Sequence, residues 1–131
     1  MRAPRAVSSR APPGGDAPRL RLRMRVMQGD AIAVGPGKIA LLEALQRARS
    51  INGAAKLLGM SYRRAWLLID ELNAALREPA VRSATGGVHG GGSELTAFGE
   101  ELIRLYRGIE QGAQRACADD IARLLAMIEP P

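Results

Sequence analysis

The side chains with the clearest chemical use lie in the stretch GMSYRRAWLLIDELN, residues 59–73. Its head holds two hydroxyl groups, on Ser61 and Tyr62, and two guanidinium groups, on Arg63 and Arg64. All four donate hydrogen bonds, and arginine pairs bidentately with a phosphate or with the O6 and N7 atoms of guanine. At the start of a helix they would join free backbone N–H groups and a positive dipole end, which also attract anions. The head therefore suits an anionic partner such as DNA.

The same stretch predicts an amphipathic helix over residues 61–76. At about 100° per residue its apolar face holds Ala65, Leu68, Ile69, Leu72, Ala75 and Leu76. Arg63 and Leu67 lie on the opposite face, where Arg63 would meet a base edge and Leu67 a thymine methyl group. Arg64, on the flank, suits a phosphate. The acids at positions 70 and 71 would repel phosphates, so the contact should be confined to the first two turns. Trp66 lies on a flank, where packing under a neighbouring element is expected more than stacking on a base.

Shorter helical patterns precede this helix. A first helix is predicted over residues 36–48, and a second over INGAAKLL, residues 51–58, with Ser50 as its N-cap and Gly59 at its end. Because Ser61 then caps the next helix, the two helices around Gly59 define a helix-turn-helix. The alternative is an ordinary helical core with a solvated charged end.

After this helix, two short extended pieces are predicted near residues 80–84 and 93–96, around a Gly-rich tip that contains His89. A hairpin in this place is what the term wing describes. Arg82 is a candidate for the DNA backbone, and His89 for an exposed loop position or a phosphate contact. A phosphate-binding loop of an enzyme is excluded, because no Lys-Ser/Thr follows the glycines.

The N-terminal region is basic. Residues 1–18 are rich in Pro and Gly and predict a disordered tail. The stretch RLRLRMRV, residues 19–26, alternates strictly and predicts a half-buried strand, followed by a turn-rich connector over residues 29–37. The outward arginines of that strand are further candidates for DNA backbone contacts; they are Arg19, Arg21, Arg23 and Arg25.

One long helix is predicted from Ala97 to Ile128, with Thr96 as its cap. Its apolar residues form a narrow seam suited to a partner helix, at Phe98, Leu102, Leu105, Ile109, Gly112 and Ala116. We expect this seam to support a homodimer. Asp119 and Asp120 either lie on a solvated face or start a new helical turn.

Composition sets outer limits. The chain of 131 residues has a net charge of +6, with most of the excess before residue 31. With a single cysteine, the sequence excludes a disulfide framework and a cysteine-based zinc site. With a single histidine, it also excludes a histidine-rich metal site and more than one Ser-His-Asp arrangement. No apolar run approaches the ~20 residues of a membrane span. We expect a cytoplasmic α+β protein, mainly α, that is not an enzyme and has no cofactor.

Two segments carry a resemblance to a known family: NGAAKLLGMSYRRAWLLIDELN, and REPAVRSATGGVHGGGSELTAFGEELIRLYRGIE. They resemble the N-terminal DNA-binding domain of the ModE family, molybdate-responsive bacterial transcriptional regulators with a winged helix related to the LysR type. The resemblance runs from about residue 20 to 115. It implies a homodimer on palindromic double-stranded DNA, with residues 61–76 as recognition helix and 80–96 as wing. It also implies DNA contacts from Ser61, Tyr62, Arg63 and Arg64, and dimer contacts from the last helix and N-terminal elements.

In that family the molybdate site lies in C-terminal β-barrel domains, whereas this sequence ends at Pro131. We therefore expect a winged-helix domain over residues 19–116, a helical extension over 117–131 and no molybdate-binding domain of its own. A separate effector protein is a candidate partner that would supply the signal. The alternative is a winged-helix protein-interaction module that acts through its last helix without specific DNA binding.

Overall fold

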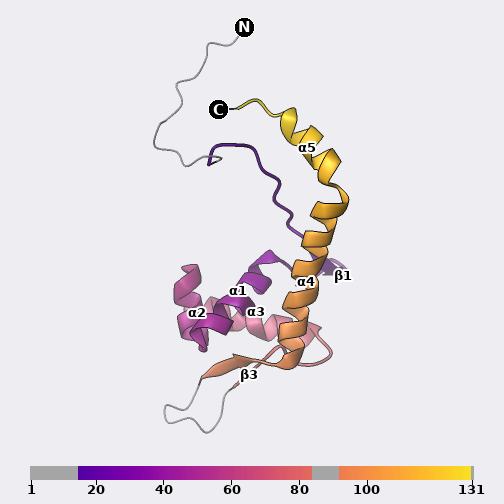
Figure 1. Cartoon of the computed structure of the whole chain (residues 1–131). Helices are drawn as coiled ribbons and strands as arrows, with labels where there is room; N and C mark the ends of the chain where they lie inside the picture. Colours follow the sequence, from indigo (N-terminus) through magenta and orange to yellow (C-terminus); the bar gives the residue numbers. More distant parts are fainter. Residues whose placement is uncertain (1–14, 84–91, 131) are drawn as a thin grey trace. The chain divides into compact units, whose positions relative to one another are not determined.

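The computed structural model describes residues 15–83 and 92–130 (Figure 1). The elements in chain order are β1 (Val26–Gln28), β2 (Ala31–Val34), α1 (Pro36–Ala48), α2 (Ile51–Leu58), α3 (Tyr62–Ala75), β3 (Val81–Ser83), β4 (Ser93–Leu95), α4 (Ala97–Ala116) and α5 (Ala118–Ala126). The expected class, α+β and mainly helical, is confirmed. The chain divides into two compact units, one of Arg23–Glu110 and one that includes residues 15–22 and 111–130.

The three helices expected before the hairpin are confirmed almost to the residue, because each is bounded by a local signal. Pro36 opens α1, and the Ser50 hydroxyl at the start of α2 accepts from the Gly53 N–H at 3.0 Å. Ser61 does the same for α3, accepting from the Arg64 N–H at 3.1 Å. Gly59 ends α2 with a φ of +67°, a conformation that costs glycine little.

The core of the larger unit lies between α1, α2 and α3. Its largest fully buried side chains are Ile39, Leu41, Leu42, Leu45 and Leu72. Ala54 and Ala65, both at 0% exposure, let α2 and α3 approach closely. On α3 the predicted apolar face is buried or half-buried except at Ala75, which is exposed.

The N-terminal strand was placed wrongly by its alternation. Residues 18–25 form no strand, although Leu20, Leu22 and Met24 are half-buried between exposed arginines, as the pattern predicts. The ladder begins at Val26 and pairs with β2, which lies in the stretch expected to be a connector. Gly29, with a φ of +61°, and Asp30 form the short turn between Gln28 and Ala31. The alternation of apolar residues and arginines therefore identified an extended segment with one side covered, but this segment has no hydrogen-bonded partner strand among the described residues.

The second hairpin, β3–β4, follows the expected positions and is fixed to both neighbouring helices. The Asn73 amide of α3 donates to the Val81 carbonyl at 3.0 Å and accepts from the Ala80 N–H at 2.8 Å. Thr96 caps α4, because its hydroxyl accepts from the Gly99 N–H at 3.0 Å while donating to the Pro79 carbonyl at 2.6 Å.

The last helical stretch is two helices rather than one. α4 ends at Ala116, Cys117 leaves the helical conformation, and α5 begins at Ala118. Asp119 and Asp120 lie in the first turn of α5, where the helix dipole favours acids. Both interpretations of this acidic pair are thus confirmed, since the two residues are exposed and also lie at the start of a new helix. Within the two described ranges, no helix combines the length and apolar character that crossing a bilayer requires.

Candidate DNA interface

The head of α3 presents its donors to the outside. The turn that leads into it is held by the Met60 N–H, which donates to the Ala55 carbonyl at 3.0 Å. Ser61, Arg63 and Arg64 are exposed. Within residues 15–83 and 92–130, neither guanidinium group has a hydrogen bond or an ion pair. Two full positive charges therefore stand at the positive end of a helix, and no acid of the described ranges neutralises them.

Three large apolar side chains share this surface. Tyr62 is 53% exposed, Trp66 45% and Leu67 43%. Together with Arg63 they line a shallow hollow of about 270 Å³ on the outer face of α3. Of the site residues predicted between positions 61 and 67, the hollow is lined by Tyr62, Arg63 and Leu67, whereas Ser61 and Arg64 are exposed on the same helix turn without lining it. Leaving so much apolar surface uncovered next to free arginines is typical of a surface that binds something.

The two acids expected to end the DNA contact, Asp70 and Glu71, differ in how much of their charge remains unneutralised. Asp70 is exposed and has no counter-ion in the described part of the chain. Glu71 instead forms an ion pair with Lys38 of α1, with 3.5 Å between Oε2 and Nζ. Because Lys38 is itself mostly buried, at 11% side-chain exposure, part of the Glu71 charge is neutralised. Asp70 is therefore the stronger repulsive group.

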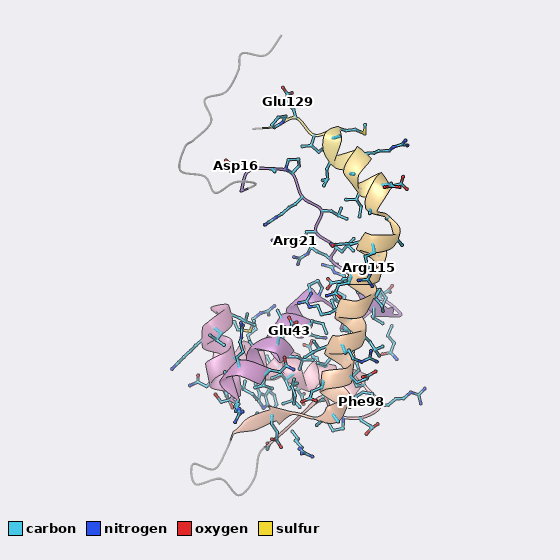
Figure 2. The ribbon with its side chains drawn as sticks, in the orientation of Figure 1. Asp16, Arg21, Glu43, Phe98, Arg115 and Glu129 are labelled. Atoms are coloured by element: carbon cyan, nitrogen blue, oxygen red, sulfur yellow. The ribbon has the colours of Figure 1, made fainter. Side chains whose placement is uncertain are left out.

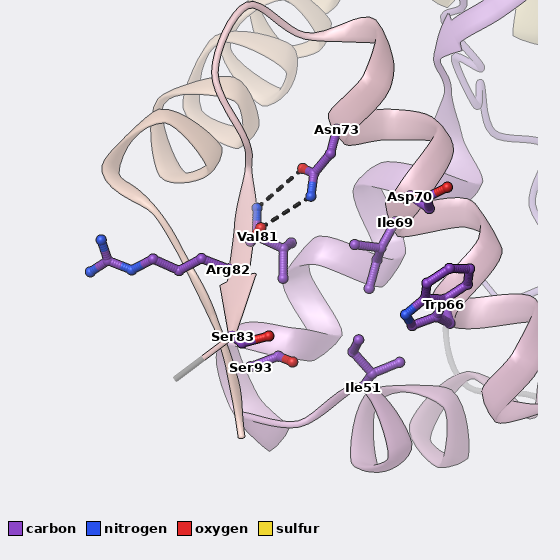
Figure 3. Close-up of a pocket in the computed structure, with 9 residues that line it drawn as sticks. All are labelled: Ile51, Trp66, Ile69, Asp70, Asn73, Val81, Arg82, Ser83 and Ser93. Carbon is purple, nitrogen blue, oxygen red and sulfur yellow. Dashed lines mark hydrogen bonds between the residues drawn. The ribbon is translucent and has the colours of Figure 1, made fainter. Parts of the chain in front are cut away.

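Trp66 also lines a second hollow, of about 130 Å³, between α3 and the β3–β4 hairpin (Figure 3). Figure 3 shows Ile51, from the start of α2, and Ser83 and Ser93, from the hairpin, around the same space. The Asn73 hydrogen bonds close its far end. The ring therefore lies at the junction of α2, α3 and the hairpin, but at 45% exposure it only partly meets the expectation that it packs under a neighbouring element.

The other predicted backbone contacts are more scattered. Arg82 also lines this hollow, but the end of its side chain points away from it (Figure 3). It pairs with Glu94 of the opposite strand, with 3.1 Å between Nε and Oε1. Arg23 and Arg25 are exposed in the larger unit, while Arg19 and Arg21 are exposed in the other unit. His89 lies outside the described residues.

One basic residue beside the hairpin was missed. Arg49 links α1 to α2 and accepts, through its carbonyl, a hydrogen bond from the Ser93 N–H at 3.2 Å. Its φ of 59° is the left-handed conformation. The sequence held a signal for this: a helix ending at Ala48 and a cap at Ser50 leave a single residue to turn the chain.

Some residues of the predicted dimer seam on α4 are half-buried, and others are exposed to solvent. Phe98, at the start of α4 in Figure 2, is half-buried, and Leu102 packs against the core. Leu105 is 49% exposed and Ile109 59% exposed. Ala116 is exposed and belongs to the other unit. The face that α4 turns inward holds a different set, Gly99, Ile103 and Tyr106.

Polar contacts hold α4 to the larger unit. The Tyr106 hydroxyl donates to the Met24 carbonyl at 2.8 Å. Arg107 donates to both carboxylate oxygens of Glu43 on α1, at 2.6 and 3.0 Å, and to Glu110 at 2.7 Å. These hydrogen bonds from Arg107 keep the pKa of Glu43 below its ordinary value. Burial raises the pKa of Tyr106.

Comparison with known proteins relates the chain to one group of bacterial proteins. No profile of a known protein family matches it. The chain is 46% identical over 88 residues to the Transcriptional regulator ModE of Yersinia pestis, covering 65% of this chain and 34% of the relative. It is 42% identical over 81 residues to the DNA-binding transcriptional dual regulator ModE of Escherichia coli strain K12, covering 62% and 31%.

A third relative extends the similarity along the chain. The Molybdenum-pterin-binding protein MopB of Rhodobacter capsulatus is 39% identical over 116 residues, covering 88% of this chain and 40% of the relative. The chain thus spans between 31% and 40% of the length of these three relatives. Over the stretch that it shares with them, the chain belongs to the ModE family.

Proposed function

We propose that the chain is a sequence-specific, double-stranded DNA-binding transcriptional regulator with a winged helix-turn-helix. The observation that carries the proposal is the uncovered head of α3, where Arg63 and Arg64 have no partner among the described residues and lie beside Tyr62, Trp66 and Leu67. α2 and α3 form the helix-turn-helix, and β3–β4 is the base of the wing. The names of the relatives, a transcriptional regulator and a DNA-binding regulator, support the same function.

The dimensions and chemistry of α3 suit a major groove. Its 14 residues extend roughly 21 Å at about 1.5 Å per residue, and a B-DNA major groove admits one helix. Arg63, opposite the buried face, reads a guanine edge, and Arg64 binds a phosphate. Asp70 marks the end of the contact with DNA, because the phosphates of the DNA backbone would repel its carboxylate.

We further propose a homodimer on a palindromic site. Leu105 and Ile109 leave an apolar stripe uncovered on α4, and a two-fold dimer would place the same stripe of each protomer against the other. Light scattering of the purified chain at high micromolar concentration tests this part; a monomeric mass would rule it out.

The main test is a binding titration with two arginine variants. After selection of a preferred duplex from random DNA, Arg63→Ala should weaken binding to that duplex by ~1–3 kcal/mol and relax its base preference at one position. Arg64→Ala should weaken selected and random duplexes about equally, because a phosphate contact carries no sequence information.

The outcomes separate the proposal from its alternative. If the wild-type chain binds no duplex even at low salt, DNA binding is wrong, and a protein-interaction module that acts through α4 takes its place. If Arg63→Ala and Arg64→Ala lose selected and random DNA to the same extent, base recognition by Arg63 is wrong while DNA binding stands.

A further inference from the structure

Two helices of the larger unit end in the same left-handed backbone conformation, but with very different residues. α2 ends at Gly59, with φ 67° and ψ 31°, whereas α1 ends at Arg49, with φ 59° and ψ 18°. Among the described residues, Arg49 is the single non-glycine with a positive φ. Glycine is favoured there because a Cβ atom crowds the backbone. Arginine at this position is therefore a costly choice for the fold alone.

Nothing inside the described part of the chain compensates for that choice through the side chain. Arg49 is exposed, and its guanidinium group has no hydrogen bond or ion pair with residues 15–83 or 92–130. Its backbone N–H donates to the Leu45 carbonyl at 2.8 Å and its carbonyl accepts from Ser93, bonds that a glycine would make equally well. The guanidinium group is thus available to a partner from outside.

The position of Arg49 indicates which partner. The Ser93 hydrogen bond ties Arg49 to the first residue of β4, at the end of the hairpin that leads to the Gly-rich tip. Two residues further along the chain, Ile51 lines the hollow that Trp66 and Ser83 also line (Figure 3). Arg49 therefore lies at the corner between the wing and the side of α3 that carries Trp66.

Arg82, the cation that the sequence pattern placed on the wing, is less available there. Glu94 holds it in an ion pair across the two strands. At the base of the hairpin, within the described residues, Arg49 is the cation with no acidic partner.

We infer that Arg49 binds a phosphate of the DNA backbone at the base of the wing, next to the groove that α3 enters. The inference rests on the proposed DNA-binding function and adds a contact that fixes the angle between wing and duplex. It explains why an arginine occupies a left-handed position where glycine would fold more easily.

The test uses three substitutions at this one position. Arg49→Gly removes the charge and relieves the backbone, so its Tm should be no lower than that of the wild type while its DNA affinity falls. Arg49→Lys keeps both the charge and the backbone strain, and should keep the binding. Arg49→Ala loses the charge without relief, so it should lose binding as the glycine variant does and have a lower Tm than that variant.

The decisive readout is the slope of log affinity against log salt concentration on a duplex of random sequence. Loss of one phosphate contact should make that slope less steep by about 0.9 in the Arg49→Gly and Arg49→Ala variants. Arg77→Ala, which removes an exposed cation beyond the far end of α3, is the matched control and should leave the slope unchanged.

The outcomes distinguish this inference from the proposed function. A wild-type chain that binds no DNA overturns both. A wild-type chain that binds DNA, with an unchanged slope in Arg49→Gly, overturns the Arg49 contact alone. A slope reduced equally in Arg49→Gly and Arg77→Ala also overturns it, since the effect would then be one of net charge.

Discussion

α3 and α4 both leave large apolar side chains uncovered, but the charges beside those side chains differ. On α3, Tyr62, Trp66 and Leu67 stand next to two arginines that have no partner in the described part of the chain, and the first turn holds no acid. On α4, Leu105 and Ile109 lie among charges that neutralise each other: Arg104 pairs with Glu101, and Arg107 with Glu43 and Glu110. Similar apolar exposure is thus combined with a positive field in one helix and with near-neutrality in the other.

The difference suggests two kinds of partner for two faces of one domain. An unneutralised positive face attracts a polyanion and gains from releasing its counterions. A face whose charges are already paired gains little from an anion, and its apolar stripe is best covered by another protein surface. The assignment of α3 to DNA and of α4 to a second protomer follows from this contrast.

The largest effect should come from a charge placed in the α4 stripe. Ile109→Asp would force two carboxylates into the proposed interface, where burying unpaired charge is costly. The dimer dissociation constant should rise by at least about 100-fold, roughly 2.7 kcal/mol. Light scattering over a concentration series measures it. Leu57→Asp, on the exposed face of α2, is the control and should stay dimeric; equal dissociation in both variants would contradict the assignment of α4.

A smaller effect is expected where α3 is tied to the wing. Asn73→Ala removes the amide that serves the Ala80 and Val81 N–H groups and the Val81 carbonyl. Leaving such groups unsatisfied should lower the free energy of unfolding by about 1–3 kcal/mol. Urea denaturation measures this loss.

Asn73→Asp sharpens the result, because it keeps the acceptor for both N–H groups and loses only the donor to the Val81 carbonyl. Its stability should fall between wild type and Asn73→Ala. If the alanine variant is as stable as the wild type, the amide does not tie the wing to α3.

The smallest effect concerns the ion pair that holds α4. The Glu43 pKa is lowered chiefly by its hydrogen bonds from Arg107. The pair therefore stabilises the fold above the unfolded pKa of about 4.3 and loses this effect as pH falls through the lower folded pKa. Because Glu43 and Arg107 are 33% and 40% exposed, the gain should stay below about 1 kcal/mol.

Glu43→Gln should thus lower the thermal midpoint slightly at pH 7 and by less at pH 3, because the wild-type carboxylate loses its charge as the pH falls through its lowered pKa. Calorimetry at both pH values measures the difference. The same loss at both pH values would show that the side chain acts through packing instead of charge.

The boundaries of the first three helices could be predicted from the sequence, because they depend on neighbouring residues. The contacts between separate elements could not, because they depend on residues far apart in the chain. α1, α2 and α3 begin where Pro36, Ser50 and Ser61 predict, and α2 ends at Gly59 as predicted, because caps act over three or four residues. β1–β2 was misplaced because alternation reports a covered side and does not identify a hydrogen-bonding partner. The two-residue connection at Gly29 was the available signal.

The candidate site shows the same division. The cluster from Ser61 to Leu67 followed from helical spacing, since it belongs to one helix. The pairing of Arg82 with Glu94 and the contact of Arg49 with Ser93 depend on how separate elements meet. On α4, two apolar stripes run side by side, and spacing alone does not decide that Gly99, Ile103 and Tyr106 form the inner one.

Ala80 is fully buried and joins three elements at one point. Its N–H is bound by Asn73 of α3, its carbonyl accepts from the Thr96 N–H at 2.9 Å, and a Cβ atom on Gly99 would lie 2.4 Å from that carbonyl oxygen. The directions of wing, α3 and the start of α4 are therefore set together. If α4 pairs across a two-fold axis as proposed, this joint also determines how far apart the two α3 heads stand. The spacing of operator half-sites would then be encoded partly in a loop that touches neither DNA nor the second protomer.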